Sequence, residues 1–449
     1  PYDQNAHAEF FDAEWMFGIT DGFDVVIGNP PYGAELSEEH KNLLKRHFEF
    51  LVERIRNSFL YFMGVSYEIS KHGGVTCLIL PNEFLFQIYM TKARRFFLNN
   101  SELIFVINVG EDVFEAIVPT CVIAFRKVKN DTYSIPVADL RECILDELPE
   151  RLNTRNFAVT TNQAIDIMPN AIFSFDLGAT ALINRLASQF HTFENFCEDV
   201  ANGISTSCDE VYIVSAEFAK QEGFEKQYLK QCIRGGQFSR YRCPTRTDEF
   251  VLYITDNFDS KIGKNIHRYL LKNKSLLVRK SVEKKNGLRA WHVLFRSRDE
   301  GLFVKPKILF RQTADKIVAA IDNEVGYYCI DSVNVGLLKP SYIPRMQYML
   351  GLLNSTLLNF YYQQISQEVG RVLAQVKPQR IKALPIADVP SSEQTPIVRL
   401  VDRILAAKRA DADADTRAWE REIDELVYQL YGLTEDEIKI VEGRQESVP

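Results

Sequence analysis

The feature that most constrains the fold of this chain is an apolar run, Phe23-Asp24-Val25-Val26-Ile27-Gly28, that stops at Asn29-Pro30-Pro31-Tyr32. An apolar run bounded by Gly and Pro is typical of a buried strand, and the two prolines, which have no backbone N–H, cannot continue its ladder. The four residues are therefore expected to project from the carboxyl end of the strand. In open α/β sheets, ligands bind at that end.

This tetrapeptide offers a specific set of polar groups. The Asn29 side chain and the carbonyls freed by the proline pair place hydrogen-bond acceptors side by side, which suits a group that carries two N–H bonds. Tyr32 adds a flat ring on which a planar base or amide can stack, worth about 1–3 kcal/mol for a base. The pattern predicts an amine clamp beside an aromatic platform. The plainer alternative is a tight turn, because Asn-Pro is common in turns.

Residues 1–130 alternate strand-like and helical patterns. Strands are predicted at 23–28, 74–80, 103–109 and 120–126, and a long helical pattern covers 37–70. This rhythm predicts an α/β fold, a partial doubly wound Rossmann-like sheet with mostly parallel strands. Residues 131–190 look irregular and are predicted to connect this domain to the next.

The rest of the chain has a different character. Residues 191–390 contain short strands, Gly turns and basic residues, which predict an α+β domain, and residues 391–449 predict a short helical tail. In the tail, apolar residues recur at helical spacing and predict a packing face. These residues are Trp419, Ile423, Leu426, Val427 and Leu430.

Composition excludes several classes of protein. No uncharged apolar run of 18 residues and no basic-then-apolar leader is present, so we expect no membrane partner and a cytoplasmic location. The eight cysteines form no Cys-x-x-Cys pair, and the seven histidines form no His-x-x-x-His pair. The sequence therefore predicts reduced thiols and no metal site.

Charge is distributed unevenly. The net charge is -7, yet residues 225–312 contain 21 Lys and Arg against 8 Asp and Glu. A basic block of this size in an acidic chain is typical of a surface that binds nucleic-acid phosphates. The alternative is an ordinary solvated charged face.

Two groups of polar residues in this block are candidate DNA contacts. Arg and Gln can read guanine and adenine through paired hydrogen bonds, whereas Lys mainly contacts phosphates. Near the Gly235-Gly236 turn and in the run at 305–311, the candidates are Arg234, Gln237, Arg240, Arg242, Lys305, Lys307 and Arg311. Candidate phosphate contacts are Lys261, Lys264, Lys272, Lys274, Arg279, Lys280, Lys284 and Lys285.

The run from Phe23 to Tyr32 resembles the catalytic motif of adenine-N6 DNA methyltransferases. The resemblance implies that Asn29 and the Pro30 carbonyl bind the target amine, with Pro31 completing the motif, and that Tyr32 stacks on a flipped base. It also implies S-adenosylmethionine as the methyl donor. Phe114, in Gly110-Glu111-Asp112-Val113-Phe114, resembles the residue that forms the second wall of the base pocket. A core Phe at a strand–loop junction is the alternative.

The second half of the chain carries a looser resemblance. A Gly-rich basic turn is followed by Lys305-Pro306-Lys307-Ile308, by Leu352-Leu353-Asn354-Ser355 and by Leu384-Pro385-Ile386. This order is similar to the target-recognition domain of Type IIG restriction-modification enzymes and related adenine methyltransferases. The two resemblances imply a site-specific adenine-N6 DNA methyltransferase of a restriction-modification or phage-defence system, with double-stranded DNA as its partner.

The family places a Gly-rich donor-binding turn before the catalytic motif, and no strand with such a turn fits before Asn29. Asp12 or Glu9 are candidates for an acidic residue that touches the donor. We therefore expect the carboxyl-terminal part of a longer enzyme, inactive alone, whose partner is an upstream methyltransferase or nuclease region. Two alternatives stay open: a DNA-recognition module without activity of its own, and a methyltransferase that acts on RNA or on a protein glutamine.

Overall fold

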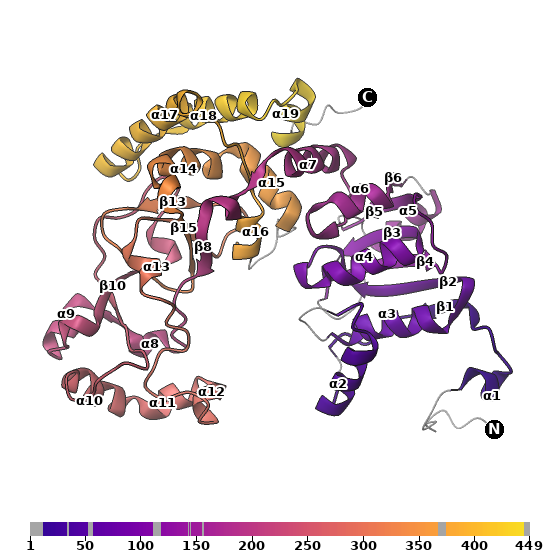
Figure 1. Ribbon diagram of the computed structural model, residues 1–449, viewed down its shortest axis with the longest axis horizontal. Helices are drawn as coiled ribbons and strands as arrows, with labels where there is room; N and C mark the ends of the chain where they lie inside the picture. Colours follow the sequence, from indigo (N-terminus) through magenta and orange to yellow (C-terminus); the bar gives the residue numbers. More distant parts are fainter. Residues whose placement is uncertain are drawn as a thin grey trace. The chain divides into compact units, whose positions relative to one another are not determined.

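The structure is a computed structural model that describes residues 12–33, 36–52, 57–110, 118–141, 143, 145–154, 157–366 and 374–443. The chain divides into two compact units, Pro1–Arg185 and Leu186–Pro449 (Figure 1). Each unit has its own sheets and its own core. No helix among the described residues is both long enough and apolar enough to cross a membrane.

Unit 1 is built on a six-stranded sheet of order β1-β2-β4-β3-β5-β6 (Figure 1). Strands β1, β2, β3 and β5 share one direction and β4 and β6 run the opposite way. Four of the six strands thus share one direction, as the sequence predicted, but only two of the five neighbouring pairs, β1-β2 and β3-β5, are parallel, so the sheet is mixed. Its strands are β1 (Phe23–Gly28), β2 (Ser70–Pro81), β3 (Glu102–Gly110), β4 (Thr120–Arg126), β5 (Ser134–Asp139) and β6 (Ala158–Thr161). Its helices are α1 (Ala13–Phe17), α2 (Glu38–His47), α3 (Ser58–Ile69), α4 (Thr91–Asn100), α5 (Leu148–Thr154) and α6 (Asn162–Ile167), and α7 (Leu177–Gln189) crosses into unit 2.

Helices α3 and α4 cover one face of this sheet. Leu78 and Leu80 of β2 are buried, whereas the alternate residue Ile79 is only half-buried, as expected for successive side chains of a strand. From the helices, the rings of Tyr67 and Phe97 both reach Phe125 of β4. The opposite face carries an apolar hollow of about 690 Å³ lined partly by Ile79.

Strand β1 lies at an edge of the sheet, and the prediction that it is buried is wrong for the described part of the chain. Val25 and Ile27 are 58% and 79% exposed. The apolar character of the run predicted its strand conformation correctly, but no other described strand pairs with its free edge.

Two other segments differ from their predictions. The helical pattern at 37–70 is two helices, α2 and α3, because buried Phe48 and Leu51 follow α2 and tie the chain to the core. Residues 134–161, predicted to be irregular, supply β5 and β6. Both are short strands with several polar residues, so their apolar pattern is weak and their pairing with the sheet decides their conformation.

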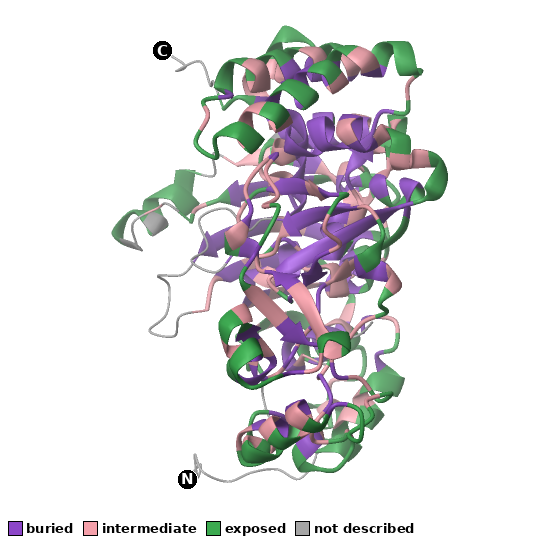
Figure 2. Cartoon of the chain, turned by 90° about the vertical axis from the view of Figure 1, so that its left-hand side faces the viewer, coloured by how far each residue is buried: buried purple, intermediate pink, exposed green. Residues whose placement is uncertain are grey.

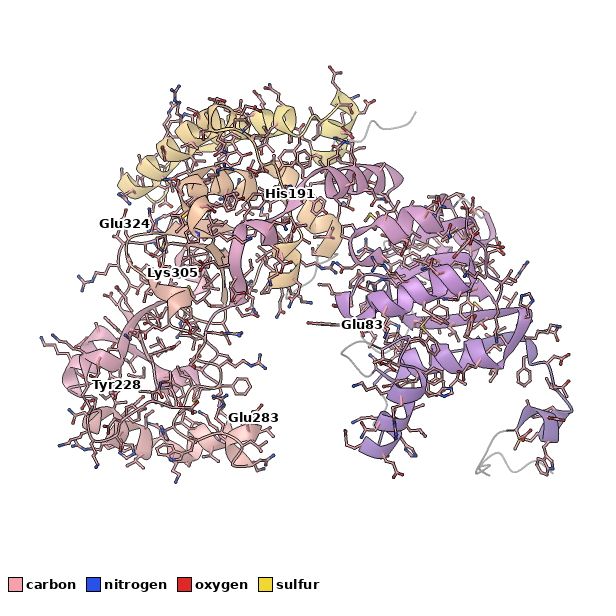
Figure 3. The ribbon with its side chains drawn as sticks, viewed as in Figure 1. Glu83, His191, Tyr228, Glu283, Lys305 and Glu324 are labelled. Atoms are coloured by element: carbon pink, nitrogen blue, oxygen red, sulfur yellow. The ribbon has the colours of Figure 1, made fainter. Side chains whose placement is uncertain are left out.

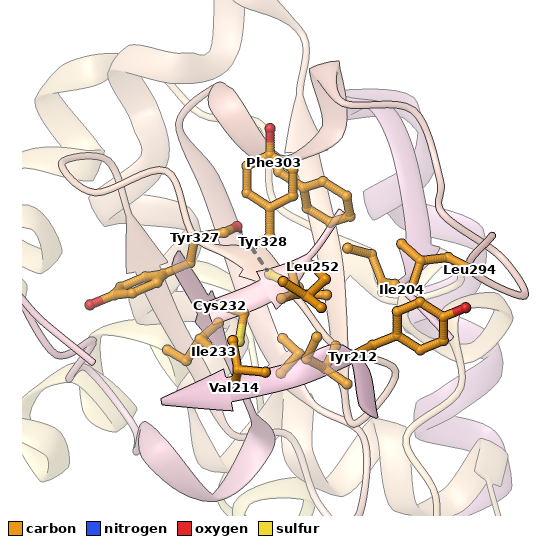
Figure 4. Close-up of a cluster of buried hydrophobic side chains, with 14 of the residues drawn as sticks. Ile204, Tyr212, Val214, Cys232, Ile233, Leu252, Leu294, Phe303, Tyr327 and Tyr328 are labelled. Atoms are coloured by element: carbon orange, nitrogen blue, oxygen red, sulfur yellow. Dashed lines mark hydrogen bonds between the residues drawn. The ribbon is translucent and has the colours of Figure 1, made fainter. Parts of the chain in front are cut away.

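Unit 2 contains two four-stranded sheets, of orders β14-β10-β11-β9 and β13-β12-β15-β8, and a smaller pair of β7 and β16. Side chains from both larger sheets share a core that includes Ile233, Leu252 and Tyr328 (Figure 4). The strands are β7 (His191–Thr192), β8 (Cys197–Asn202), β9 (Ile213–Ser215), β10 (Leu229–Ile233), β11 (Glu249–Leu252), β12 (Lys307–Arg311), β13 (Ala319–Asp322), β14 (Tyr328–Cys329), β15 (Val333–Leu338) and β16 (Pro385–Ile386). Short helices between them are α8 (Asp209–Tyr212), α9 (Ala216–Gln221), α10 (Lys264–Lys272), α11 (Lys274–Arg279), α12 (Val282–Lys285) and α13 (Gly301–Val304).

Helices complete unit 2 on the carboxyl-terminal side, where buried residues of α14 lie beneath more exposed outer helices (Figure 2). Gly351 of α14 lets α17 approach closely, because a Cβ there would lie 2.6 Å from Ile397 Cγ2. Ile423 and Val427 of α18 are fully buried, which confirms the predicted packing face. The helices are α14 (Met346–Asn354), α15 (Thr356–Ser366), α16 (Pro378–Lys382), α17 (Ser391–Ala410), α18 (Arg417–Leu430) and α19 (Glu435–Val441).

Candidate active site and nucleic-acid interface

The tetrapeptide Asn29 to Tyr32 leaves the sheet at the carboxyl end of β1. The strand ends at Gly28, which pairs with Leu78 of the parallel neighbour β2. Beyond it, Asn29 is exposed and Pro30 is buried. The Asn29 side chain thus lies at the sheet edge where the sequence placed it, with its amide open to solvent.

The ring of Tyr32 is held by its own hydroxyl group. The hydroxyl donates a hydrogen bond of 3.0 Å to the carbonyl of Ile79, the residue of β2 just past the partner of Gly28. Partial burial raises the pKa of Tyr32 to about 12, with a smaller contribution from Cys121. The phenol therefore stays protonated at neutral pH and keeps this bond, while part of the ring remains exposed.

A second anchor lies on the backbone of the motif. Ser58, buried in the first turn of α3, donates a hydrogen bond of 2.6 Å from Oγ to the carbonyl of Pro31. This bond fixes the peptide plane between Pro31 and Tyr32. The motif is thus held at the strand end, at the Pro31 carbonyl and at the Tyr32 hydroxyl.

The loop after β2 forms the neighbouring wall of the same edge. Asn82 Nδ2 donates to Asn108 Oδ1 at 3.3 Å, and Asn57 Nδ2 donates to Glu83 Oε1 at 3.4 Å. Glu83 marks this edge of unit 1 in Figure 3. Asn57, Ser58 and Asn108 were not indicated as residues of this edge by the sequence alone. Asn108 could have been found, because it is a polar residue near the end of a predicted strand.

Arg94 of α4 fixes this loop from inside the protein. It is fully buried, and its guanidinium donates to the carbonyls of Phe84, at 2.6 Å, Asn170, at 2.8 Å, and Ala171, at 2.9 Å. Asn170 and Ala171 both have positive φ angles, 61° and 50°, which cost about 1–2 kcal/mol each for residues other than glycine. The hydrogen bonds from Arg94 offset part of that cost and join the loop to the segment that leads into α7.

Two further residues, Phe114 and Asp12, are predicted site residues. Phe114 lies outside the described residues. Asp12 caps the amino end of α1, where its Oδ1 accepts a hydrogen bond of 2.9 Å from the Trp15 amide. Asp12 is exposed, and α1 has no buried residue. Its predicted contact with a methyl donor stays a prediction.

In unit 2, three of the predicted DNA contacts build the turn on which they lie. The Arg234 amide donates to Gln237 Oε1 at 2.7 Å, and Gln237 Nε2 donates to Glu249 at 2.9 Å. Arg311 donates from Nε to the Gly235 carbonyl at 2.8 Å. The Arg234 guanidinium also lies 3.2 Å from Glu249. These side chains shape the turn through contacts within the protein.

The other four candidates have different surroundings. Arg240 donates a hydrogen bond of 2.6 Å to the carbonyl of Asn354, the last residue of α14. Arg242 is half-buried and has no acidic partner among the described residues, and exposed Lys305 pairs with Glu198. Lys307 differs from the prediction, because it is fully buried in an ion pair with Asp322 at 2.6 Å. Its ammonium is enclosed by the protein and does not reach the surface.

The main basic surface lies on α10, α11 and α12. Residues 264–285, hereafter the basic segment, contain eight basic side chains and one acidic side chain, that of Glu283. All the basic side chains except Lys284 are exposed. Lys284 is 4% exposed and donates to the Tyr212 hydroxyl at 3.0 Å, and burial lowers its pKa to about 8. The exposed members are Lys264, Arg268, Lys272, Lys274, Arg279, Lys280 and Lys285.

Comparison with protein families gives one match in each of the two units. Residues 2–114 match the Eco57I restriction-modification methylase family, and residues 231–386 match the TaqI-like C-terminal specificity domain. The first match contains the clamp and the second contains the Gly turn and the basic segment.

Individual relatives are distant. The Type II methyltransferase M.AccI of Acinetobacter calcoaceticus is 23% identical over 327 residues, which cover 69% of this chain and 59% of the relative. The Type II restriction enzyme and methyltransferase RM.Eco57I of Escherichia coli is 26% identical over 212 residues, which cover 45% of this chain and 20% of the relative. The chain thus spans little more than half of the first relative and a fifth of the second.

The solved structure of the Type IIL restriction-modification enzyme MmeI superposes with a TM-score of 0.63 at 12% identity, over 93% of this chain and 56% of that one. At this identity the similarity concerns the fold alone. The two family matches show a region similar to the Eco57I restriction-modification methylases followed by a region similar to the TaqI-like C-terminal specificity domain.

Proposed function

We propose that the protein transfers a methyl group to N6 of an adenine extruded from a specific site in duplex DNA. The observation that carries this proposal is the anchored clamp, in which Asn29 is exposed beside a Tyr32 ring fixed through its hydroxyl. The methylase and specificity matches support a DNA substrate and a restriction-modification role.

The clamp suits the chemistry of an aromatic amine. The lone pair of the adenine amine is delocalised into the ring, which makes the nitrogen a poor nucleophile. Acceptance of its two hydrogens by the Asn29 side chain and the Pro30 carbonyl favours sp3 geometry and frees that lone pair for attack. The rate then depends on positioning and on stabilisation of the developing positive charge.

Tyr32 has a separate role in this proposal. Extrusion of a base from a duplex costs a few kcal/mol, which is offset by stacking and by pocket contacts. The anchored ring offers a stacking face of fixed orientation, so little side-chain freedom is lost when the base arrives. Ser58 acts through Pro31 and is a positioning residue.

The methyl donor implied by this chemistry is S-adenosylmethionine, whose sulfonium supplies an electrophilic methyl group. The described residues around the sequence candidate Asp12 do not fit a donor pocket, because Asp12 is exposed and its carboxylate caps a helix with no buried residue. No described residue is therefore assigned to donor binding.

The DNA-binding surface proposed here is the basic segment together with Arg242 and Lys305. The exposed lysines and arginines of the basic segment are proposed to contact phosphates of the DNA backbone. Such contacts position a protein on DNA without reading the base sequence. Arg234, Gln237 and Arg311 are assigned a supporting role, because they hold the turn next to Arg242. The MmeI structure is a complex with DNA, which supports a DNA partner for this fold.

The decisive experiment uses the full-length protein with Asn29→Ala and Tyr32→Ala. N6-methyladenine in duplex DNA is measured by mass spectrometry, and DNA affinity is measured in parallel. We expect a loss of methylation of at least about a hundredfold, since several kcal/mol of transition-state stabilisation disappear, with DNA affinity nearly unchanged. Asn153→Ala, at an exposed position of α5, is the matched control.

Retention of methylation by Asn29→Ala would reject the clamp. Methylation of a protein glutamine or of RNA in place of duplex DNA would favour the alternative substrates that a clamp for an NH2 group also fits. DNA binding with no methylation in the unaltered full-length protein would favour a recognition module.

A further inference from the structure

Two buried asparagines of unit 1 differ from the other buried asparagines of the described residues. Asn162, Asn334 and Asn354 each use both the nitrogen and the oxygen of the side-chain amide in hydrogen bonds within the protein. Asn82 and Asn108 are 6% and 4% exposed, and within the described part of the chain each uses only one of these two atoms. A buried amide with an unused donor or acceptor costs free energy, so its presence needs an explanation other than stability.

A single hydrogen bond joins the two side chains. Asn82 Nδ2 donates to Asn108 Oδ1 at 3.3 Å, which is longer than the usual distance of about 2.9–3.0 Å. The bond occupies the carbonyl of Asn108 and leaves its Nδ2 group without a partner among the described residues. The neighbours of Asn108 in β3, Ile107 and Val109, are buried and apolar. Asn82 therefore determines which end of the Asn108 amide stays free.

The pair lies at the carboxyl edge of the sheet, on the face that carries an anchor of the clamp. Asn108 and Leu80 are both paired with Cys121 of β4, so the three side chains point to the same face. Asn82 follows β2 directly. Leu80 is fully buried on the face that α3 covers, and Ser58, the first residue of α3, anchors the clamp backbone.

Cys121 also connects the pair to the aromatic ring of the clamp. It lies close enough to the Tyr32 hydroxyl to contribute to the raised pKa of Tyr32. The same hydroxyl donates to the carbonyl of Ile79, the residue before Leu80. Directly paired residues of neighbouring strands have Cβ atoms about 5 Å apart. A base that stacks on Tyr32 therefore has ring atoms within reach of the Asn108 amide.

We propose that Asn108 Nδ2 donates a hydrogen bond to a ring nitrogen of the extruded adenine and that Asn82 is the positioning residue that orients it. This inference rests on the proposed function and adds a base contact to it. The clamp accepts the amine hydrogens, whereas N1 and N7, the ring nitrogens on either side of the amine, are acceptors. Stacking on Tyr32 leaves the base free to rotate in its own plane. A second in-plane contact fixes that rotation.

The test uses the full-length protein and duplexes that carry its target site, identified beforehand from the methylated positions of genomic DNA. The target position carries adenine, 1-deazaadenine or 7-deazaadenine, in which carbon replaces N1 or N7 and the amine is kept. The opposite position is abasic, so that the three bases differ little in pairing. Single-turnover methylation is measured with an excess of S-adenosylmethionine.

Three variants examine the pair. Asn108→Ala removes the donor, and Asn82→Ala removes the group that orients it. The double variant Asn82→Leu/Asn108→Leu replaces both partners by apolar groups of similar size, a change that is often nearly neutral for stability. Asn162→Ala is the matched control, because it truncates another buried asparagine of unit 1, whose partners are Tyr133 and Asp131.

The unaltered protein should methylate one of the two analogues about tenfold more slowly than adenine, the effect of one hydrogen bond between neutral groups. Asn108→Ala and the double variant should be about tenfold slower on adenine and should no longer distinguish adenine from that analogue. Asn82→Ala should reduce the distinction without abolishing it. Asn162→Ala should keep the rate ratio of the unaltered protein, whatever its stability.

The outcomes separate this inference from the proposed function. Equal rates of the unaltered protein on adenine and both analogues would overturn the base contact without any variant. A loss in Asn108→Ala and in the double variant that is the same on all three duplexes would give Asn108 a structural role and would also overturn it. No methylation of any duplex by the unaltered protein would reject the proposed function, and this inference with it.

Discussion

Lys307 and Asp322 form an ion pair that the protein encloses completely, with 2.6 Å between Nζ and Oδ2 and side chains that are 0% and 1% exposed. The Oδ2 atom of Asp322 also accepts a hydrogen bond of 2.7 Å from the Tyr327 amide. The Lys307 ammonium also donates a hydrogen bond of 2.5 Å to the Phe303 carbonyl. Such a pair is tolerated only when its remaining hydrogen-bonding groups are satisfied. The pair joins the strands β12 and β13 to the turn before β14.

Replacement of Lys307 by Met should strongly destabilise unit 2. The substitution removes the ammonium and leaves the Asp322 carboxylate buried, a change that typically costs about 3–5 kcal/mol. Urea unfolding at neutral pH measures the loss. Lys305→Met is the control, because its partner Glu198 is partly exposed and such surface pairs contribute at most about 1 kcal/mol. Equal losses in the two variants would contradict the structural role of the buried pair.

Asn354→Ala should also destabilise unit 2, through lost backbone partners. The fully buried Asn354 accepts a hydrogen bond from the Ala319 amide and donates one to the Ala319 carbonyl, both at 3.0 Å. The variant leaves the Ala319 amide without a partner, at about 1–3 kcal/mol, whereas the Ala319 carbonyl keeps the hydrogen bond that it accepts from the Tyr241 amide. We therefore expect a decrease of about 1–3 kcal/mol in the free energy of unfolding, measured by denaturant titration. Asn286→Ala, at an exposed site, should change it by less than about 0.5 kcal/mol.

The sequence predicted those strands whose apolar runs are bounded by breakers. β1 and β4 begin and end at the predicted residues, because Gly28 ends the apolar pattern of β1 and Pro119 precedes that of β4. β6, with four residues, has too little pattern to be separated from a loop. Its pairing with β5, which decides its conformation, is a long-range property.

The position of Asn29 to Tyr32 at the carboxyl end of β1 was predictable, because the apolar run and the two prolines that end it are consecutive in the sequence. The role of Ser58 was not predictable, because Ser58 lies 27 residues after Pro31 in the sequence and its hydroxyl reaches the Pro31 carbonyl only in the folded chain. Lys307 was misplaced for a related reason. A lysine between Pro306 and Ile308 has the pattern of a surface residue, and Asp322, which neutralises it, lies 15 residues away on the neighbouring strand.

The stability of the protein should depend on Lys284 between pH 8 and 10.5. Burial lowers the pKa of this lysine to about 8 in the folded protein, against 10.5 for an ordinary lysine. Between these values the unfolded chain binds more protons, so stability rises with pH through this group. Lys284→Met removes the effect. Buried cysteines and tyrosines have raised pKa values, so they make the free energy of unfolding decrease with pH. The quantity to measure is therefore the difference in the free energy of unfolding between the variant and the unaltered protein.

The free energy of unfolding of the unaltered protein, minus that of Lys284→Met, should increase by on the order of 2 kcal/mol as the pH rises from 8 to 10.5. Denaturant unfolding at several pH values measures it. Lys280→Met is the control, because Lys280 is exposed and pairs with Glu210 at the surface. A difference that stays constant over this range would contradict the burial of an ionisable lysine at position 284.

Lys272 and Lys274 provide the sharpest test of the basic segment, because both are exposed and neither has an acidic partner among the described residues. Each phosphate contact that is lost lowers the slope of log affinity against log salt by about 1. The double variant Lys272→Gln/Lys274→Gln should therefore bind DNA of any sequence more weakly, with a salt slope reduced by about 1–2. Arg421→Gln, which removes an exposed cation on α18, is the control and should leave the slope unchanged. A slope that is the same in all three proteins would place the phosphate-binding surface outside the basic segment.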